Sequence, residues 1–177
     1  MDRCLKEFLH MVATTRHIRL TYITTGESVV AEMLDNEAPE VCRIVWELLP
    51  LEGKALHGMY SGAEVFLLLD RAVEHPPENL CQLPLPGELL LFTDISSSVA
   101  NSKKPISEVC FVYNRGVVLR GPEGVPTHCS LFARIPGDWK HDWPAFRDAC
   151  LNAGFPEALD HNRPGALGVG EPCWLKW

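Results

Sequence analysis

Four residues in one short stretch of the chain carry side chains that can move protons or polarise a carbonyl group. They are His57, Tyr60, Ser61 and Glu64, within the sequence HGMYSGAE. A histidine can act as a general acid or base because its unperturbed pKa is near ~6.5, and a carboxylate can orient it or remove a proton. We therefore take His57, Tyr60 and Glu64 as candidate catalytic residues, whereas Ser61 is more typical of a turn.

The same stretch also fits an ordinary β-hairpin, and both interpretations stay open. Successive strand residues point to opposite faces, so His57 and Tyr60 face apart unless a turn or bulge brings them together. In the hairpin interpretation, the His57 ring would bind a backbone carbonyl group, and the Glu64 carboxylate would face solvent. An exposed imidazole in a cleft, with a perturbed pKa, would favour catalysis. A buried imidazole bonded to backbone would favour a structural role.

Residues that could hold a substrate occur later in the chain. Tyr113 and Arg115 lie in YNRG, and His128 and Arg134 lie in PTHCSLFAR. An arginine guanidinium can donate two parallel hydrogen bonds to a carboxylate. Arg115 fits an exposed turn equally well, and Arg134, in an otherwise apolar strand, needs a partner or faces water. We take all four as candidate substrate-binding residues.

Metal and cofactor motifs are missing from the sequence. His57, His128 and Glu64 could form a metal site on paper, but no HxH, HExxH or paired-cysteine spacing supports one. The glycine-rich GALGVG at 165–170 lies in a tail rather than between a strand and a helix, and there is no GxSxG elbow. We expect neither a metal nor a cofactor.

Composition narrows the class of protein. The 177 residues suffice for one domain with a real core, and 46% are hydrophobic. A formal charge of −7 argues against a nucleic-acid or anionic-membrane surface. The seven scattered cysteines show no CxxC pair, which favours a reduced, cytoplasmic protein. The N-terminal residues lack the apolar core of a signal peptide, and no apolar run approaches the ~20 residues of a membrane helix.

The pattern of apolar residues predicts a mainly β protein. Residues 1–15 fit a short amphipathic helix, and 17–24 and 28–34 alternate as the two strands of a hairpin. A helix follows, capped by Asp35 or Asn36, with Pro39 in its first turn, and it ends at Pro50. Further strands are expected at about 54–60, 63–69, 87–93, 107–114, 117–120 and 128–135.

Loops and a second helix complete the expected organisation. Residues 71–86 hold four prolines and are expected to form a loop, and 93–107 form a polar loop of a length that is usually functional or mobile. A second helix begins after Asp142 as its cap and stops at Gly154. We expect an extension over 1–15, a domain over 16–153, and a tail over 154–177 that docks on it through its tryptophans. Eight strands and two helices favour a closed antiparallel barrel.

The order of these pieces resembles the cyclophilin fold, an eight-stranded antiparallel barrel with a helix over each end. Within that fold, the chain resembles an uncharacterised bacterial family of small cyclophilin-like proteins. The residues that carry the resemblance are Leu34–Pro39, WELLPLEG at 46–53, HGMYSGAEVF at 57–66, PGELLLF at 86–92 and LFARI at 131–135. The resemblance covers about residues 16–153.

The resemblance implies some activities and argues against another. Cyclophilins carry an arginine after the strand histidine, but here Gly58 follows His57 and the glutamine-rich strand is missing. Prolyl isomerisation is therefore not expected. The chain is also more distantly similar to the cyclophilin-like domain of cucumopine- and mikimopine-type opine synthases. These join an amine to a 2-oxo acid by a Pictet–Spengler cyclisation without a redox cofactor.

Two hypotheses follow. The first is a cofactor-free small-molecule enzyme with acid/base side chains at the barrel mouth, acting on an amine and a 2-oxo acid in an opine-synthase-like condensation or cyclisation. The second is a non-catalytic module that binds a metabolite or a protein, which could be a second copy of itself in a homo-oligomer.

Overall fold

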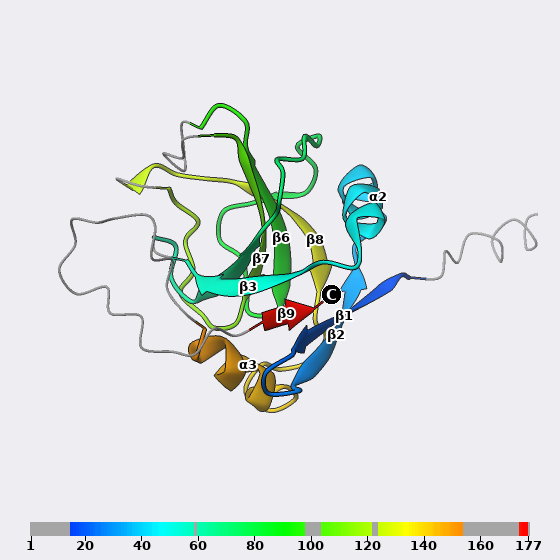
Figure 1. Cartoon of the computed structure of the whole chain (residues 1–177), viewed down its shortest axis with the longest axis vertical. Helices are drawn as coiled ribbons and strands as arrows, with labels where there is room; N and C mark the ends of the chain where they lie inside the picture. Colours follow the sequence, from blue (N-terminus) through cyan, green and yellow to red (C-terminus); the bar gives the residue numbers. More distant parts are fainter. Residues whose placement is uncertain (1–14, 59, 98–103, 122–123, 154–173, 177) are drawn as a thin grey trace, which may run out of the picture.

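The computed structural model describes residues 15–58, 60–97, 104–121, 124–153 and 174–176 (Figure 1). The N-terminal helix expected over 1–15 and most of the tail lie outside these ranges. Within them the chain forms nine strands and two helices. The strands are β1 His17–Tyr22, β2 Ser28–Met33, β3 Glu52–His57, β4 Glu64–Leu68, β5 Leu80–Cys81, β6 Glu88–Asp94, β7 Ile106–Val112, β8 Cys129–Arg134 and β9 Trp174–Lys176, and the helices are α2 Pro39–Leu48 and α3 Pro144–Leu151.

The strands form one curled antiparallel sheet. Their order is β2-β1-β9-β3-β4-β7-β6-β8-β5, and β2 also pairs with β8 through Glu32–Arg134 and Met33–Ala133. The prediction of a mainly antiparallel β fold with two helices is confirmed. The predicted closed barrel of eight strands is replaced by nine strands curled into a half-barrel. Figure 1 shows α2 and α3 far apart, α2 at the upper right and α3 at the lower left of the curled sheet.

Some predicted elements differ from the structure. β5 lies inside the segment expected to be a loop, because a two-residue strand leaves no alternating pattern to detect. Residues 117–120 form no strand. An isolated bridge joins Arg120 to Pro126, and the N–H groups of Val118 and Leu119 donate to the carbonyl oxygens of Ser61 and Gln82. β9 lies between β1 and β3 and pairs with both, so it joins these two strands into one sheet.

Both predicted helix caps are wrong. Helix α2 has Ala38 at its N-cap, with no side-chain cap bond from the neighbouring residues. The N–H groups of Glu40 and Val41 instead donate to one carboxylate oxygen of Glu78, each at 2.9 Å. Helix α3 has Trp143 at its N-cap, and the Asp142 carboxylate accepts the N–H of Asp138 instead. Pro39 and Pro144 each occupy the first helical turn, where a missing N–H is tolerated.

The two faces of the sheet carry different cores. On β1, Ile18, Leu20 and Tyr22 are buried and the residues between them are half-buried or exposed, which defines the inner face. The main core lies on this face and includes buried residues of α2 and α3 such as Val45 and Phe146. A smaller cluster covers the outer face of β6, β7 and β8, and it contains Leu90, Cys110, Val112, Val117, Leu119, Cys129 and Leu131.

Among the described residues, no helix is both long and apolar enough to cross a membrane.

Candidate functional site

His57, the first candidate catalytic residue, is buried on the inner face. It is only 6% exposed and lies opposite Val65 in the β3–β4 ladder. Its Nε2 lies 3.4 Å from the carbonyl oxygen of Leu151, and a carbonyl accepts only from an N–H, so Nε2 carries the proton. Burial lowers the pKa of His57 below its ordinary value, although hydrogen bonds to the backbone of Leu151 and Glu64 oppose this.

Tyr113 is the residue that the structure brings to His57. Its hydroxyl lies 3.4 Å from His57 Nδ1, and the two rings meet edge to face with centroids 5.7 Å apart. Burial raises the pKa of Tyr113 to about 12. By the criterion set out from the sequence, a buried imidazole bonded to backbone favours a structural role for His57.

Glu64 does not join His57. It is the neighbour of Val65 on β4, so its side chain leaves the strand on the outer face. It is 6% exposed, its Oε2 has no hydrogen-bond partner, and burial raises its pKa to about 7, although a hydrogen bond with Ser61 opposes the shift. A β-carbon at Gly58 would lie 2.5 Å from Glu64 Oε1, so the carboxylate fills the space that a side chain at position 58 would need.

Tyr60 and Ser61 lie in the irregular segment between β3 and β4, where both are half-buried. The Ser61 hydroxyl accepts the N–H of Arg120 at 3.2 Å and lies 3.3 Å from the Arg120 carbonyl oxygen. Ser61 therefore ties this turn to the segment after β7. No described contact places Tyr60 beside His57, so these two candidates are not shown to act together.

The two candidate arginines do not meet at a common site. Arg134 is an exposed side chain, and it is paired with the carboxylate of buried Glu88 at 3.1 Å. Arg115 is exposed in the turn after Tyr113. Its backbone N–H donates a hydrogen bond to Oδ1 of the Asn114 side chain.

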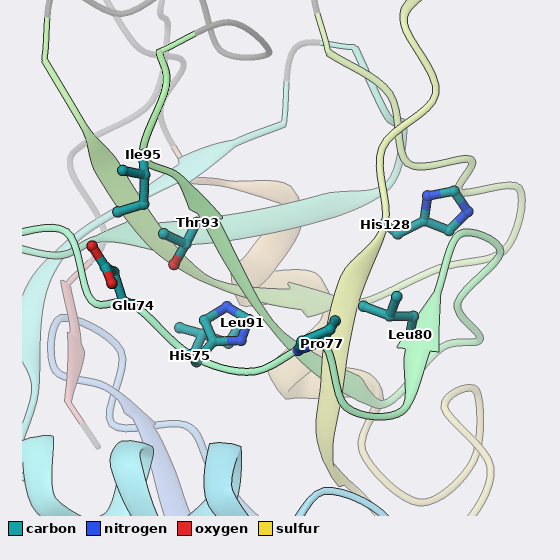
Figure 2. Close-up of a pocket in the computed structure, with 8 residues that line it drawn as sticks. All are labelled: Glu74, His75, Pro77, Leu80, Leu91, Thr93, Ile95 and His128. Carbon is teal, nitrogen blue, oxygen red and sulfur yellow. The ribbon is translucent and has the colours of Figure 1, made fainter.

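His128, the remaining candidate, lines a pocket of about 510 Å³. This volume lies within the range of small-molecule sites, which is roughly 300–1,000 Å³. Figure 2 shows Thr93 on β6, Ile95 just after this strand, and His128 on the other side, just before β8. The full lining is Glu74, His75, Pro77, Leu80, Leu91, Thr93, Ile95 and His128. The pocket thus combines an apolar wall with two imidazoles, a carboxylate and a hydroxyl.

One wall of the pocket is a segment that we call the strap, residues 73–79. At its start, the N–H of Val73 donates to the Ser107 hydroxyl at 2.8 Å, and the Thr93 hydroxyl donates to the Val73 carbonyl at 2.9 Å. At its end, Glu78 accepts the first N–H groups of α2, and the Asn79 side chain donates to the Leu131 carbonyl at 2.9 Å. Bonds at both ends fix the strap, so the pocket is formed before any ligand enters.

The strap also determines which ring nitrogen of His75 carries the proton in the neutral imidazole. Its Nδ1 lies 2.9 Å from the Pro76 carbonyl oxygen, and a carbonyl only accepts, so Nδ1 donates. In the neutral ring, Nε2 is then the nitrogen that can accept a proton. His75 is half-buried and Glu74, the preceding residue, is exposed. A base beside a carboxylate at the edge of this pocket can take a proton from a substrate and attract a cationic group.

Glu74, His75, Thr93 and Glu78 were not among the residues singled out from the sequence. The available signal was the length of the 71–86 loop, since loops of that length are usually functional or disordered. Among the described residues, no group of three or more His, Cys, Asp or Glu side chains could hold a metal ion.

Comparison with known proteins gives the family of the chain. A family model described as "Protein of unknown function (DUF3830)" matches residues 20–152, so the chain belongs to this family. The match covers most of the curled sheet and both helices. No curated protein matches the chain.

The fold is also similar to a solved structure, that of McbB in complex with tryptophan. The two share 12% sequence identity with a TM-score of 0.59, and the match covers 91% of this chain and 43% of that one. The chain therefore spans less than half the length of McbB, and at this identity the likeness concerns the fold alone.

Proposed function

We propose that the protein binds a small molecule carrying an amine in the pocket beneath the strap, and that it uses His75 and Glu74 to move protons there. The pocket itself carries this proposal, because a concave pocket of this volume, which combines apolar side chains with a few polar groups, is a usual form of a ligand site. The fold likeness to McbB supports it in one respect: that protein binds tryptophan, an amino acid with an amine and an electron-rich ring.

The sharpest version is a cofactor-free amine–carbonyl condensation of the Pictet–Spengler type. An amine adds to the carbonyl carbon of a 2-oxo acid and water leaves, which gives an iminium. An electron-rich ring carbon then attacks the iminium carbon, and the C=N electron pair moves to nitrogen. Loss of a proton from the ring restores its aromaticity, and the product is the sum of both reactants minus one water.

The pocket residues would have distinct roles in this reaction. Nε2 of His75 would accept the ring proton, since Nδ1 already donates to the Pro76 carbonyl. The Glu74 carboxylate would stabilise the positive charge of the iminium. His128, at the rim just before β8, is the lining residue whose ring N–H could donate to the carboxylate of the oxo acid. Arg115 and Arg134 have no place in this scheme because neither lines the pocket.

The test is a condensation assay with tryptophan and 2-oxoglutarate, followed by mass spectrometry. The expected product has the summed mass minus one water, and it forms faster with the wild-type protein than with His75→Ala. His141→Ala is the matched control, because His141 is an exposed histidine outside the pocket. Product formation at equal rates in all three samples would contradict a catalytic role for His75.

A non-catalytic binding module is the second candidate. The specific observation in its favour is His57, whose buried ring bonded to the Leu151 carbonyl matches the structural reading. This candidate predicts that a ligand stabilises the protein through the pocket, while no condensation product appears.

A further inference from the structure

Two cysteines face each other directly behind the pocket. Cys81 on β5 is the register partner of Cys129 on β8, in an antiparallel pair only two residues long. Directly opposed residues in such a pair have Cα atoms about 4.5–5.5 Å apart. This distance lies inside the range of roughly 4.4–6.8 Å found in disulfides. Both thiols are free in this structure.

The two side chains also point the same way. Cross-strand partners share a face, and both cysteines belong to the outer cluster, Cys129 as a buried member and Cys81 packed against it. Their β-carbons are expected about 4.5–5.5 Å apart, against roughly 3.5–4.5 Å in a disulfide. Closure therefore needs an approach of about 1 Å, which a two-residue strand at the end of the sheet order can provide.

We propose that Cys81 and Cys129 form a redox modification site, at which a peroxide converts the thiol pair into a disulfide that ties β5 to β8. Cys81 reacts first because it is partly exposed, whereas Cys129 is 3% exposed. The Cys81 thiol and hydrogen peroxide give a sulfenic acid and water. The Cys129 thiol then attacks that sulfur, the disulfide forms and a second water leaves. Two thiols thus lose two electrons and reduce one peroxide.

The surroundings make this reaction slow at neutral pH. Burial raises the pKa of both thiols, and the charge of Glu88 adds to the shift at Cys81, while those of Glu64 and Glu108 add to it at Cys129. The thiolate is the reactive form, so the rate should increase with pH. Sustained oxidant, rather than a brief exposure, is therefore needed to close the bond.

The disulfide would act on the pocket because the same ladder forms part of its lining. Leu80 and His128, the neighbours of the two cysteines in sequence, both line the cavity. A bond between β5 and β8 would fix these two residues relative to each other. The effect on ligand binding rests on the proposed function, whereas formation of the disulfide does not.

The test treats the folded 177-residue chain with hydrogen peroxide, blocks the remaining thiols and maps tryptic peptides by mass. Cleavage after Lys and Arg, except before Pro, places Cys81, Cys110 and Cys129 on three separate peptides, 72–103, 104–115 and 121–134. The expected product links 72–103 to 121–134 with the loss of two hydrogen atoms. The link should form faster at pH 9 than at pH 7.

Two variants complete the experiment. Cys81→Ser should lose the link, whereas Cys110→Ala, which changes a buried thiol of the same cluster, should keep it. A circular dichroism melt of each variant checks that it is folded. A link from Cys81 to any other cysteine, oxidation of Cys81 that leaves Cys129 as a thiol, or no reaction in the folded protein would each overturn the proposal. None of these readouts needs a ligand, so this proposal can fail while the proposed function stands.

Discussion

The carboxylate of Glu78 accepts a 2.9 Å hydrogen bond from the N–H of Val41, so a residue 37 positions away caps helix α2. The same oxygen also accepts the N–H of Glu40. These N–H groups belong to the first helical turn, which has no partner within the helix, and the positive end of the helix dipole favours a carboxylate there. One side chain therefore stabilises the helix and holds the far end of the strap that lines the pocket.

Replacing Glu78 should destabilise the protein. Loss of a helix cap typically costs about 0.5–2 kcal/mol, and each kcal/mol lowers Tm by roughly 2–4 °C at this size. We expect Glu78→Ala to lower Tm by about 1–8 °C on this basis. Glu37→Ala is the control, because Glu37 is an exposed acid just before the helix and makes no side-chain cap bond. Equal Tm values for the two variants would show that the cap contributes nothing.

Two fully buried serines should respond oppositely to substitution by alanine. The Ser107 hydroxyl accepts the N–H of Val73 and contacts the Thr93 hydroxyl at 2.6 Å, whereas the Ser130 hydroxyl has no partner. Ser107→Ala leaves a polar group of the strap unsatisfied, which costs about 1–3 kcal/mol. Ser130→Ala removes an unsatisfied group and should be neutral or slightly stabilising. Urea unfolding of both variants measures the difference, and a larger loss for Ser130→Ala would refute this ranking.

The buried Glu64 carboxyl should make stability depend on pH. Its pKa is about 7 in the folded protein against an ordinary value of 4.5, because burial disfavours the charge. The folded chain therefore holds an extra proton between these pH values, and stability falls as pH increases from about 4.5 to 7. The total change is of the order of 3 kcal/mol, since each pKa unit is worth about 1.4 kcal/mol.

Glu64→Gln should remove this part of the pH dependence. The drop in Tm between pH 5 and pH 8 should be smaller in the variant than in the wild type. Glu108 adds a slope of the same sign, because burial, with a contribution from the Glu64 charge, raises its pKa to about 8. Some dependence therefore remains in the variant. Glu47→Gln, at an exposed position, should leave the wild-type curve unchanged, and parallel curves for all three proteins would contradict the assignment to Glu64.

His57 should matter for stability and not for ligand binding. Removing its buried ring in His57→Ala leaves a cavity in the main core, with an expected loss of about 3 kcal/mol by analogy with other large-to-small core changes. A compound that binds beneath the strap should still raise the Tm of this variant by the wild-type amount. If binding is lost while the variant stays folded, His57 belongs to the site after all.

Alternating apolar residues were enough to predict the long strands. On β1 and β2, the buried residues Leu20 and Ala31 alternate with exposed ones, as the sequence pattern indicates. β5 and β9 have two and three residues, and so short a segment carries no periodicity. Their place in the sheet depends on pairing with distant strands, which one sequence does not reveal.

The candidate site was less predictable for a related reason. His57 and Glu64 are seven positions apart in sequence, but strand alternation sends their side chains to opposite faces. His75 and His128 are 53 positions apart, and the strap and the start of β8 place them beside one cavity. The cap on α2 comes from Glu78 rather than Asp35, which is instead paired with Arg16. Long-range contacts decide these positions, and local spacing does not encode them.

The most direct test of the account is a thermal-shift titration with tryptophan, other amines and 2-oxo acids, performed on the wild type, His75→Ala and His141→Ala. A ligand at 100 times its Kd adds about 2.7 kcal/mol, which corresponds to a Tm increase of roughly 5–10 °C at this size. The account predicts that an amine-bearing compound raises the Tm of the wild type and of His141→Ala, and that the shift is reduced or lost in His75→Ala. Equal shifts in all three proteins, or no shift with any compound, would contradict the claim that the pocket at His75 is the binding site.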